Sequence, residues 1–149
     1  MRILVLNGPN INLLGIREPD IYGQETYETL LENLQELAQT EGIEIDHFQS
    51  NHEGALVDRI QESLGTYDGL VINPAAYTHT SIAILDALQA VGLPTIEVHL
   101  SDINQREAFR QHSYVSRYAK ATIVGQGLAG YRLAIQNLKA IIKEQTCEH

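Results

Sequence analysis

The sequence predicts an α/β fold with three layers, in which helices cover both faces of a five-stranded parallel sheet. Five short apolar runs, bounded by turn residues, alternate with longer segments whose apolar residues recur at helical spacing. Strands that are apolar throughout are typical of parallel sheets buried on both faces. Right-handed crossovers leave few topologies, and at 149 residues the flavodoxin-like strand order is the one we expect.

The first part of the chain predicts two strands, a loop and a helix. Residues 3–6 are apolar and end in the turn sequence Asn-Gly-Pro-Asn, which indicates a buried strand. The following segment, up to residue 23, lacks periodicity, and such long connections are often lids or binding loops. Leucines at helical spacing predict a helix over residues 25–40, which Gly42 ends. Residues 43–48 are less uniformly apolar, so we expect a strand near the sheet edge.

The middle of the chain predicts a helix on either side of a third strand, residues 70–72. Apolar residues at i, i+4 and i+8 mark the helix before it and are Leu56, Ile60 and Leu64. Candidate N-caps of the helix after it are Thr78, Thr80 and Ser81. The residues expected on the inner face of that helix are Ile82, Leu85, Leu88 and Ala90. Gly92 and Pro94 then end it.

The last part of the chain predicts two more strands, each followed by a helix. Residues 95–100 form the fourth strand, and Ser101 or Asn104 can cap a helix after it. Residues 121–124 form the fifth strand, and a Gly-Gln-Gly turn leads into the final helix. The apolar residues expected along that helix are Leu128, Leu133, Leu138, Ile141 and Ile142.

Composition limits the class of protein. With 44% hydrophobic and 19% charged residues, the chain fits a single domain over residues 1–149. No apolar run approaches the ~20 residues of a membrane span, and no signal-peptide pattern is seen. The single cysteine, Cys147, excludes an intrachain disulfide, so we expect a cytoplasmic protein. A net charge of -9 disfavours nucleic acid or membrane as partner, although a few arginines can still bind a small anion.

Polar side chains follow most of the predicted strands, at the edge of the sheet where ligands bind in such folds. The group is Asn7, Asn10, Arg17, Tyr22, Asn73, His79, Glu97, His99, Ser101, Arg106 and Arg110. Arg106 and Arg110 are four residues apart and can share a helix face. His79 and Asp86, seven apart, can also share a face. Tyrosine, histidine and arginine together suit an anionic substrate and proton transfer.

Each member of this group also has a purely structural interpretation. Asn7, Asn10 and Asn73 are of a residue type that forms turns, and His79 can be a polar residue near a helix start. The arginines can form a solvated face, Tyr22 can be a packed loop aromatic, and an aspartate can pair across a subunit contact. The convergence at one sheet edge is what indicates a site.

Two other patterns point elsewhere and are weaker. Residues 125–130, Gly-Gln-Gly-Leu-Ala-Gly, match the GxGxxG pattern between a strand and a helix. That fingerprint continues into a second strand with an acidic residue ~20 positions on, and here the chain ends in or just past the helix. A tight turn is therefore favoured over a nucleotide site. The six histidines show no HExxH or CxxC-type spacing, so we expect no metal site.

Five segments, in their order and spacing, resemble the type II 3-dehydroquinate dehydratases (type II dehydroquinases) of the shikimate and quinate pathways. They are LNGPNINLLGIREPDIYG, SNHEG, INPAAYTHTS, EVHLSDINQREAFR and VGQGLAGY. The resemblance runs through nearly the whole chain. It implies a flavodoxin-like catalytic domain, no cofactor, and a homododecamer built as a tetramer of trimers. It leaves open whether the role is biosynthetic or catabolic.

The resemblance also implies the reaction, an anti elimination of water from 3-dehydroquinate through an enolate to give 3-dehydroshikimate. Tyr22 is the base and acts as tyrosinate, an anion that the guanidinium of Arg17 favours. Asn10, through an ordered water, stabilises the enolate. His99 protonates the departing hydroxyl as general acid, and Glu97, on the same strand face, orients its ring.

Substrate binding carries over to further positions of this sequence. Contacts to the carboxylate and hydroxyl groups are implied for Asn73, His79, Leu100, Ser101 and Arg110. Arg106 supports the loop and its tyrosine, and Asp86 reaches the active site of a neighbouring subunit. The loop that holds Arg17 and Tyr22 closes over the substrate.

The lysines give an independent point about mechanism. The chain has three lysines, and they lie in its last third, away from the clustered loops: Lys120, Lys139 and Lys143. A Schiff-base route is therefore disfavoured.

Two other functions compete with the enzyme. A ligand-binding module for phosphate or nucleotide is supported by the glycine-rich turn and by fold analogy alone. A catalytically silent oligomeric scaffold would have no need of the tyrosine, arginine and histidine set.

Overall fold

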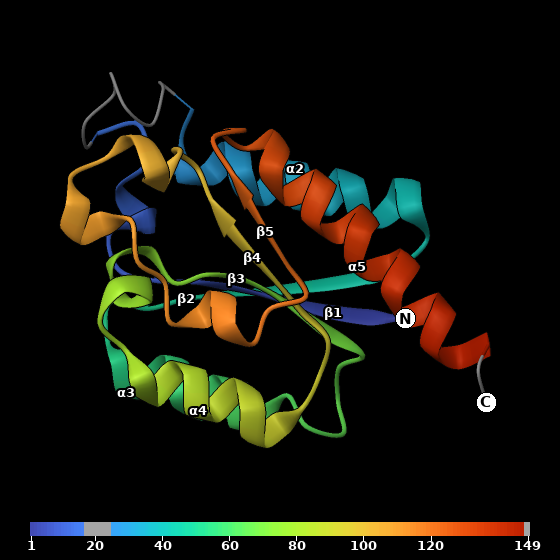
Figure 1. The fold of residues 1–149 in the computed structure, drawn as a ribbon. Coiled ribbons are helices and arrows are strands. Elements are labelled where there is room, and N and C mark those ends of the chain that lie inside the picture. The colour runs from blue at the N-terminus through green and yellow to red at the C-terminus, as the bar shows by residue number, and fades with distance from the viewer. Residues whose placement is uncertain (17–24, 148–149) are drawn as a thin grey trace.

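A computed structural model shows the chain folded into three layers, and it describes residues 1–16 and 25–147. Helices α2 (Tyr27–Glu41) and α5 (Ala129–Cys147) cover one face of a central sheet. Helices α3 (Glu53–Glu62) and α4 (Ile82–Val91) cover the other, as Figure 1 shows. Two separate hydrophobic clusters result, one between the sheet and each helical layer. Among the described residues, no helix combines the length and apolarity needed to span a membrane.

The sheet has the strand order β2-β1-β3-β4-β5, and the pairings that the structure describes are parallel. Its strands are β1 (Arg2–Asn7), β2 (Glu44–Gln49), β3 (Gly69–Asn73), β4 (Thr95–His99) and β5 (Ala121–Val124). The three inner strands are almost wholly buried, whereas β2 and β5 at the edges are only half buried. The predicted fold class, strand order and edge position of residues 43–48 are therefore confirmed.

The helix ends follow the expected chemistry. Thr26 caps α2 by accepting a hydrogen bond from the Thr29 amide, and Ser81 caps α4 by accepting from Ile84. Of the three candidate caps before α4, Ser81 is thus the one used. Gly42 and Gly92 end α2 and α4 in the left-handed conformation, with φ of 66° and 72°, which favours glycine.

Some of the apolar residues from which the helices were predicted are exposed. Leu64 lies beyond the end of α3 and is 62% exposed, because the helix stops at Glu62. In α4, Ile82 is 53% exposed and Ala90 is also exposed, since the buried face is formed by Ile84, Leu85, Ala87 and Leu88. Leu133 of α5 is 41% exposed because the buried face of that helix follows Tyr131, Ile135 and Leu138.

The predicted α-helix after β4 is wrong. Three short 3-10 turns lie there instead, at Ile103–Gln105, Ala108–Arg110 and Val115–Arg117. Asp102, and neither Ser101 nor Asn104, caps the first of them. These turns bury only Ile103 and Val115, so the segment has no apolar stripe with which to dock a helix.

The backbone segments that follow β1 and β3 lie in close contact, and this contact positions the loops above the sheet. Asn7 and Asn73 are register partners at the ends of the two strands. The Gly8 amide donates to the Asn73 carbonyl oxygen at 2.8 Å. A Cβ on Gly8 would lie 2.3 Å from the carbonyl oxygen of Pro74, so only glycine fits there.

Candidate active site

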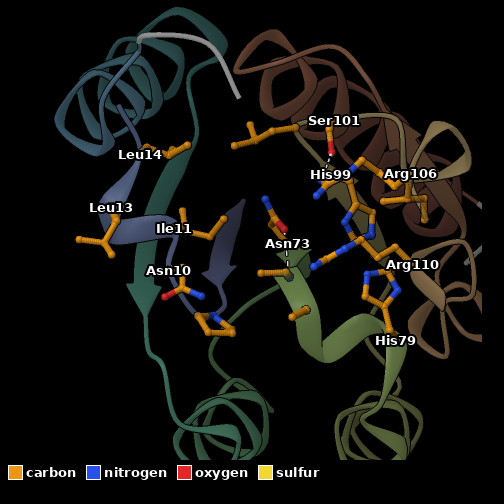
Figure 2. A pocket seen from close by; sticks show the side chains of 15 residues that line it. Asn10, Ile11, Leu13, Leu14, Asn73, His79, His99, Ser101, Arg106 and Arg110 are labelled. Atoms are coloured by element: carbon orange, nitrogen blue, oxygen red, sulfur yellow. Dashed lines mark hydrogen bonds between the residues drawn. The ribbon is translucent and has the colours of Figure 1, made fainter. Parts of the chain in front are cut away.

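A pocket opens at the carboxyl ends of β1, β3 and β4, as Figure 2 shows. Eight of the residues predicted for the site line it: Asn10, Asn73, His79, His99, Leu100, Ser101, Arg106 and Arg110. Its remaining wall is largely apolar and includes Ile11 and Leu14 from the turn after β1. A cavity with apolar walls and a few convergent polar groups is typical of a small-molecule site.

The other predicted site residues lie elsewhere. Glu97 stands behind His99, fully buried. Asp86 is exposed on α4 and does not line the pocket. Arg17 and Tyr22 lie outside the described residues. The structure thus gathers the residues predicted for substrate binding and the predicted acid at one pocket, and it leaves Asp86 on an outer surface.

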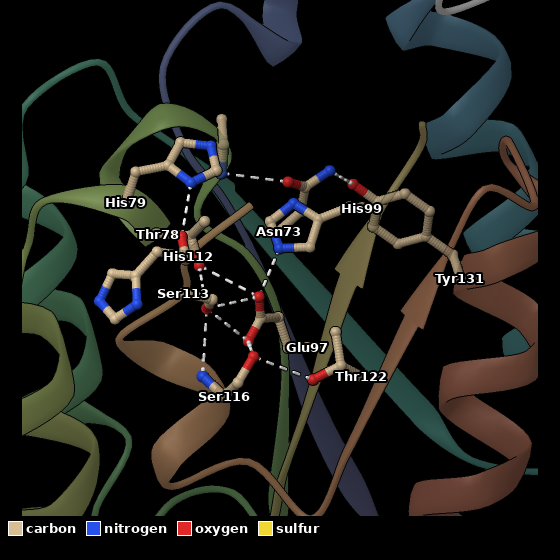
Figure 3. A network of polar contacts seen from close by, with 11 residues as sticks. Asn73, Thr78, His79, Glu97, His99, His112, Ser113, Ser116, Thr122 and Tyr131 are labelled. Carbon is tan, nitrogen blue, oxygen red and sulfur yellow. Dashed lines mark hydrogen bonds and ion pairs between the residues drawn. The ribbon is translucent and has the colours of Figure 1, made fainter. Parts of the chain in front are cut away.

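Glu97 and His99 are two residues apart on β4 and so point to the same side of the sheet. Oε2 of Glu97 contacts Nε2 of His99, as Figure 3 shows. Because a carboxylate only accepts hydrogen bonds, Nε2 carries a hydrogen in this contact, and Nδ1 is left to take up or deliver a proton.

Three hydroxyl groups surround the Glu97 carboxylate. Ser116 donates to Oε1 at 2.8 Å, Ser113 lies 2.9 Å from Oε2, and Thr78 donates to Oε2 at 3.1 Å. Burial raises the pKa of Glu97, but the contact with His99 and the serine hydroxyls outweigh it and hold that pKa below its ordinary value. A buried carboxylate that is paired and hydrogen-bonded in this way stays ionised and keeps the His99 ring in one orientation.

His79 presents a hydrogen-bond acceptor to the pocket. Its Nδ1 lies 2.7 Å from the His112 carbonyl oxygen and therefore carries the hydrogen, which leaves Nε2 with a lone pair. Burial lowers the pKa of His79 and outweighs the bond to His112, and the nearby His99 and Arg110 lower it further. The imidazole is thus neutral at neutral pH and suited to a substrate hydroxyl.

Arg106 and Arg110 reach the same pocket although they share no helix. Glu107 lies between them, with Oε2 at 2.8 Å from Nε of Arg110 and 3.8 Å from Nε of Arg106. The contact to Arg110 is an ion pair by distance but is poorly aligned for a hydrogen bond. Arg106 also donates to the Ser101 hydroxyl at 3.4 Å. Two guanidinium groups make this side of the pocket suited to an anion.

Asn10 stands in a left-handed conformation, with φ of 69°, which asparagine tolerates better than most residues. Its amide N–H donates to Oδ1 of Asn51 at 3.0 Å. Gln49 in turn donates to that Oδ1 at 3.2 Å and to the Gly8 carbonyl at 3.1 Å. The turn after β1 is therefore held from the edge strand β2.

Sequence reasoning missed several residues that hold the site from behind. These are Asn51, Thr78, Glu107, Ser113, Ser116 and Tyr131. Four of them fall inside segments that carried the family resemblance, which was a usable signal: Asn51, Thr78, Glu107 and Tyr131. No pattern pointed to Ser113 and Ser116, because only the crossing of their segment beneath β4 brings them to Glu97.

The glycine-rich turn before α5 serves the fold. The Gly127 amide donates to the Leu100 carbonyl at 3.1 Å, and Gly125 and Gly127 have φ of 73° and 56°. Gly130 lies where α5 packs on β4, and a Cβ there would meet Val98 at 3.4 Å, an ordinary van der Waals distance. Across residues 1–16 and 25–147, no three histidine, cysteine or acidic side chains are grouped so as to hold a metal.

The sequence of this chain is similar to those of known proteins. The family described as dehydroquinase class II matches residues 1–139. A catabolic 3-dehydroquinase of Aspergillus clavatus is 52% identical over 143 residues, which cover 96% of this chain and 95% of the relative. A 3-dehydroquinate dehydratase of a Sulfurovum species is 53% identical over 144 residues, which cover 97% of this chain and 89% of the relative.

Solved structures agree with the sequence relatives. The type II dehydroquinase from Butyrivibrio crossotus superposes with a TM-score of 0.92 at 52% identity, covering 93% of this chain and 97% of the other. A 3-dehydroquinate dehydratase-like protein from Bifidobacterium longum superposes with a TM-score of 0.68 at 30% identity, covering 97% and 98%.

Proposed function

The chain belongs to the class II dehydroquinase family and is a type II 3-dehydroquinate dehydratase, and from this premise we propose the mechanism and the residues that carry it. Tyr22 removes a proton from the carbon next to the ketone of 3-dehydroquinate. His99 protonates the hydroxyl that departs from the opposite face. The elimination is anti and passes through an enolate.

One observation supports the acid step above all: the contact of His99 with the buried, ionised Glu97 at the wall of a pocket that also holds two arginines. In the proposed step, the C–O bond breaks as the proton moves from Nδ1 of His99 to the leaving oxygen, and water departs. The enolate electrons form the new double bond. Tyr22 then releases its proton to solvent and His99 takes one up from solvent, so both residues return to their starting protonation states.

The base step rests on the resemblance and on the chemistry of tyrosine, because Arg17 and Tyr22 lie outside the described residues. A tyrosinate needs a cation near it at neutral pH, and Arg17 is the proposed one. Another tyrosine close to the site is Tyr131, but it is buried and its pKa is raised, so it keeps its proton and cannot serve as base.

The pocket residues divide between the groups of the substrate. We assign carboxylate and ring-hydroxyl contacts to Asn73, His79, Leu100, Ser101 and Arg110. Asn10 holds the water that stabilises the enolate, and its strained but tethered backbone suits a fixed donor. Arg106 supports the closing loop, and its bond to Ser101 ties it to the exit of β4.

We propose that the enzyme works as a homododecamer, a tetramer of trimers, in which Asp86 completes the site of a neighbouring subunit. Its exposure on α4, outside the pocket of its own chain, is what such a role requires. Ile82, one turn before it, is 53% exposed and offers apolar surface for the same contact. A role in the shikimate or quinate pathway and a location in the cytoplasm stay predictions.

Labelled substrate tests the proposed stereochemistry. Two samples of 3-dehydroquinate are prepared, each carrying deuterium at one of the two hydrogens between the ketone and the carbon that loses its hydroxyl. An anti elimination removes label from the sample whose deuterium lies opposite the hydroxyl and retains it in the other, as read by mass spectrometry of the product. The reverse pattern would show a syn elimination and exclude the proposed placement of base and acid.

A further inference from the structure

Asn73 is held by a tyrosine that does not itself line the pocket. The Tyr131 hydroxyl, on a side chain only 1% exposed, lies between the amides of two strand-end asparagines. It accepts from Nδ2 of Asn73 at 3.0 Å and donates to Oδ1 of Asn7 at 2.6 Å. Figure 3 shows Tyr131 approaching Asn73 on the side away from His79. Helix α5 thereby contacts the ends of β1 and β3 at once.

The hydrogen bonds of this network have one consistent direction. Oδ1 of Asn73 accepts from the amide N–H of Ala75 at 3.1 Å, which turns Nδ2 toward Tyr131. A phenol has a single hydroxyl hydrogen. Tyr131 donates this hydrogen to Asn7, so the Tyr131 oxygen must accept from Asn73. The amide of Asn73 is therefore fixed, and one Nδ2 hydrogen remains outside this network.

We propose that Tyr131 is a positioning residue, which locks the Asn73 amide so that it offers an N–H donor, and not its carbonyl oxygen, to an acceptor group of the substrate. The inference rests on the proposed function, which assigns Asn73 to substrate binding. It adds a reason for the buried hydroxyl on α5. The donor would discriminate in favour of a carboxylate or carbonyl oxygen over a group that only donates.

Asn7 supports the inference from the other end of the network. Its side chain is fully buried at the end of β1, and its Nδ2 has no hydrogen-bond partner among the described residues. An unpaired buried N–H lowers stability, so packing alone does not explain an asparagine there. Its Oδ1, in contrast, supplies the acceptor that sets the direction of the Tyr131 hydroxyl.

The network does not titrate in the working range of pH. Burial raises the pKa of Tyr131, so its hydroxyl stays protonated, and the amides carry no charge. Loss of the hydroxyl is therefore expected to change substrate binding and to leave the pH dependence of turnover unchanged. A residue that takes part in proton transfer would change that dependence.

A double-mutant cycle tests the proposal. We compare kcat and KM for 3-dehydroquinate in the wild type, Tyr131→Phe, Asn73→Ala and the double variant. Tyr131→Phe is expected to raise KM about five- to tenfold with kcat within about twofold and the pH profile retained. In the Asn73→Ala background it should add nothing further. Tyr118→Phe is the matched control, because that hydroxyl donates to the Leu93 carbonyl at 2.7 Å, outside the pocket.

An unchanged KM in folded Tyr131→Phe would overturn the inference, and so would an equal loss in the Asn73→Ala background. If Tyr131→Phe does not fold, Asn7→Leu takes its place, with the same expected rise in KM and the same overturning result. Wild-type protein without activity on 3-dehydroquinate would instead refute the proposed function, so the two failures are distinguishable.

Discussion

The carboxylate of Glu97 touches Nε2 of His99 while it lies wholly out of solvent, and only His99 of the two lines the pocket. A charged group held in this way is costly unless it is fully hydrogen-bonded. Thr78, Ser113 and Ser116 supply those bonds from two separate segments of the chain. The buried charge of Glu97 therefore serves to orient the His99 imidazole.

Replacing this carboxylate by an amide should slow turnover. Glu97→Gln keeps the size of the side chain, but an amide accepts fewer hydrogen bonds and carries no charge to hold the protonated ring. We expect kcat to fall about 10- to 100-fold with KM little changed, because His99 acts after the substrate is bound. Steady-state kinetics check this, and a kcat close to wild type would show that His99 needs no partner.

Acid should destabilise the protein partly through Glu97. The pKa of Glu97 is lowered in the folded state, so between that pKa and the ordinary carboxyl value the unfolded chain binds a proton and the native chain does not. The contribution of Glu97 to the free energy of unfolding is therefore fully present above the ordinary carboxyl pKa. It is lost as pH falls through the lower pKa that Glu97 has in the folded state.

Urea unfolding at pH 7 and at successively lower pH measures this loss. Glu97→Gln should show a shallower decline than the wild type, whereas Glu36→Gln, on the exposed side of α2, should decline in parallel with it. Parallel curves for the wild type and Glu97→Gln would contradict the assignment.

Substrate binding should weaken in acid through His79. Its lowered pKa keeps the ring neutral at neutral pH, and protonation converts Nε2 from an acceptor to a donor. KM is therefore expected to stay flat above the ordinary histidine pKa of ~6.5 and to rise only as pH falls below it. His79→Asn should raise KM at neutral pH and remove part of the acid rise. An acid rise of full size in His79→Asn would assign the effect to another group.

Arg110, which forms an ion pair with Glu107, should contribute to substrate binding. Arg110→Ala removes a cation from the pocket wall and is expected to raise KM for the anionic substrate about tenfold or more. Arg117→Ala, an exposed arginine of the last 3-10 turn, serves as control for the loss of one positive charge. Equal effects of the two variants on KM would mean that the net charge matters and the pocket contact does not.

The sheet was predictable because most of its strands are short apolar runs, and the clustering of the candidate site residues was predictable because parallel strands end at one edge. The segment between β4 and β5 was not. Ser101 and Asn104 suggested a helix cap, but a helix needs an apolar stripe to dock, and only Ile103 and Val115 are buried in the three turns of this segment. Local capping signals cannot replace missing tertiary contacts.

The residues that support the site from behind were not predicted from the sequence, for a related reason. Ser113 and Ser116 reach Glu97 only because their segment crosses beneath β4, and Tyr131 reaches Asn73 only because α5 packs over β3 and β4. Such contacts join residues far apart in the sequence. Spacing within one element contains no information about them.

The most direct test of the proposed mechanism compares Tyr22→Phe with the wild type in one assay. Metal-stripped protein is mixed with 3-dehydroquinate, the ultraviolet absorbance of the conjugated product is followed, and substrate binding is measured by calorimetry. We expect turnover by the wild type without added cofactor, and a fall of about 10²- to 10⁴-fold in Tyr22→Phe with binding retained. Near-normal turnover in Tyr22→Phe would show that this tyrosine is not the base of the elimination.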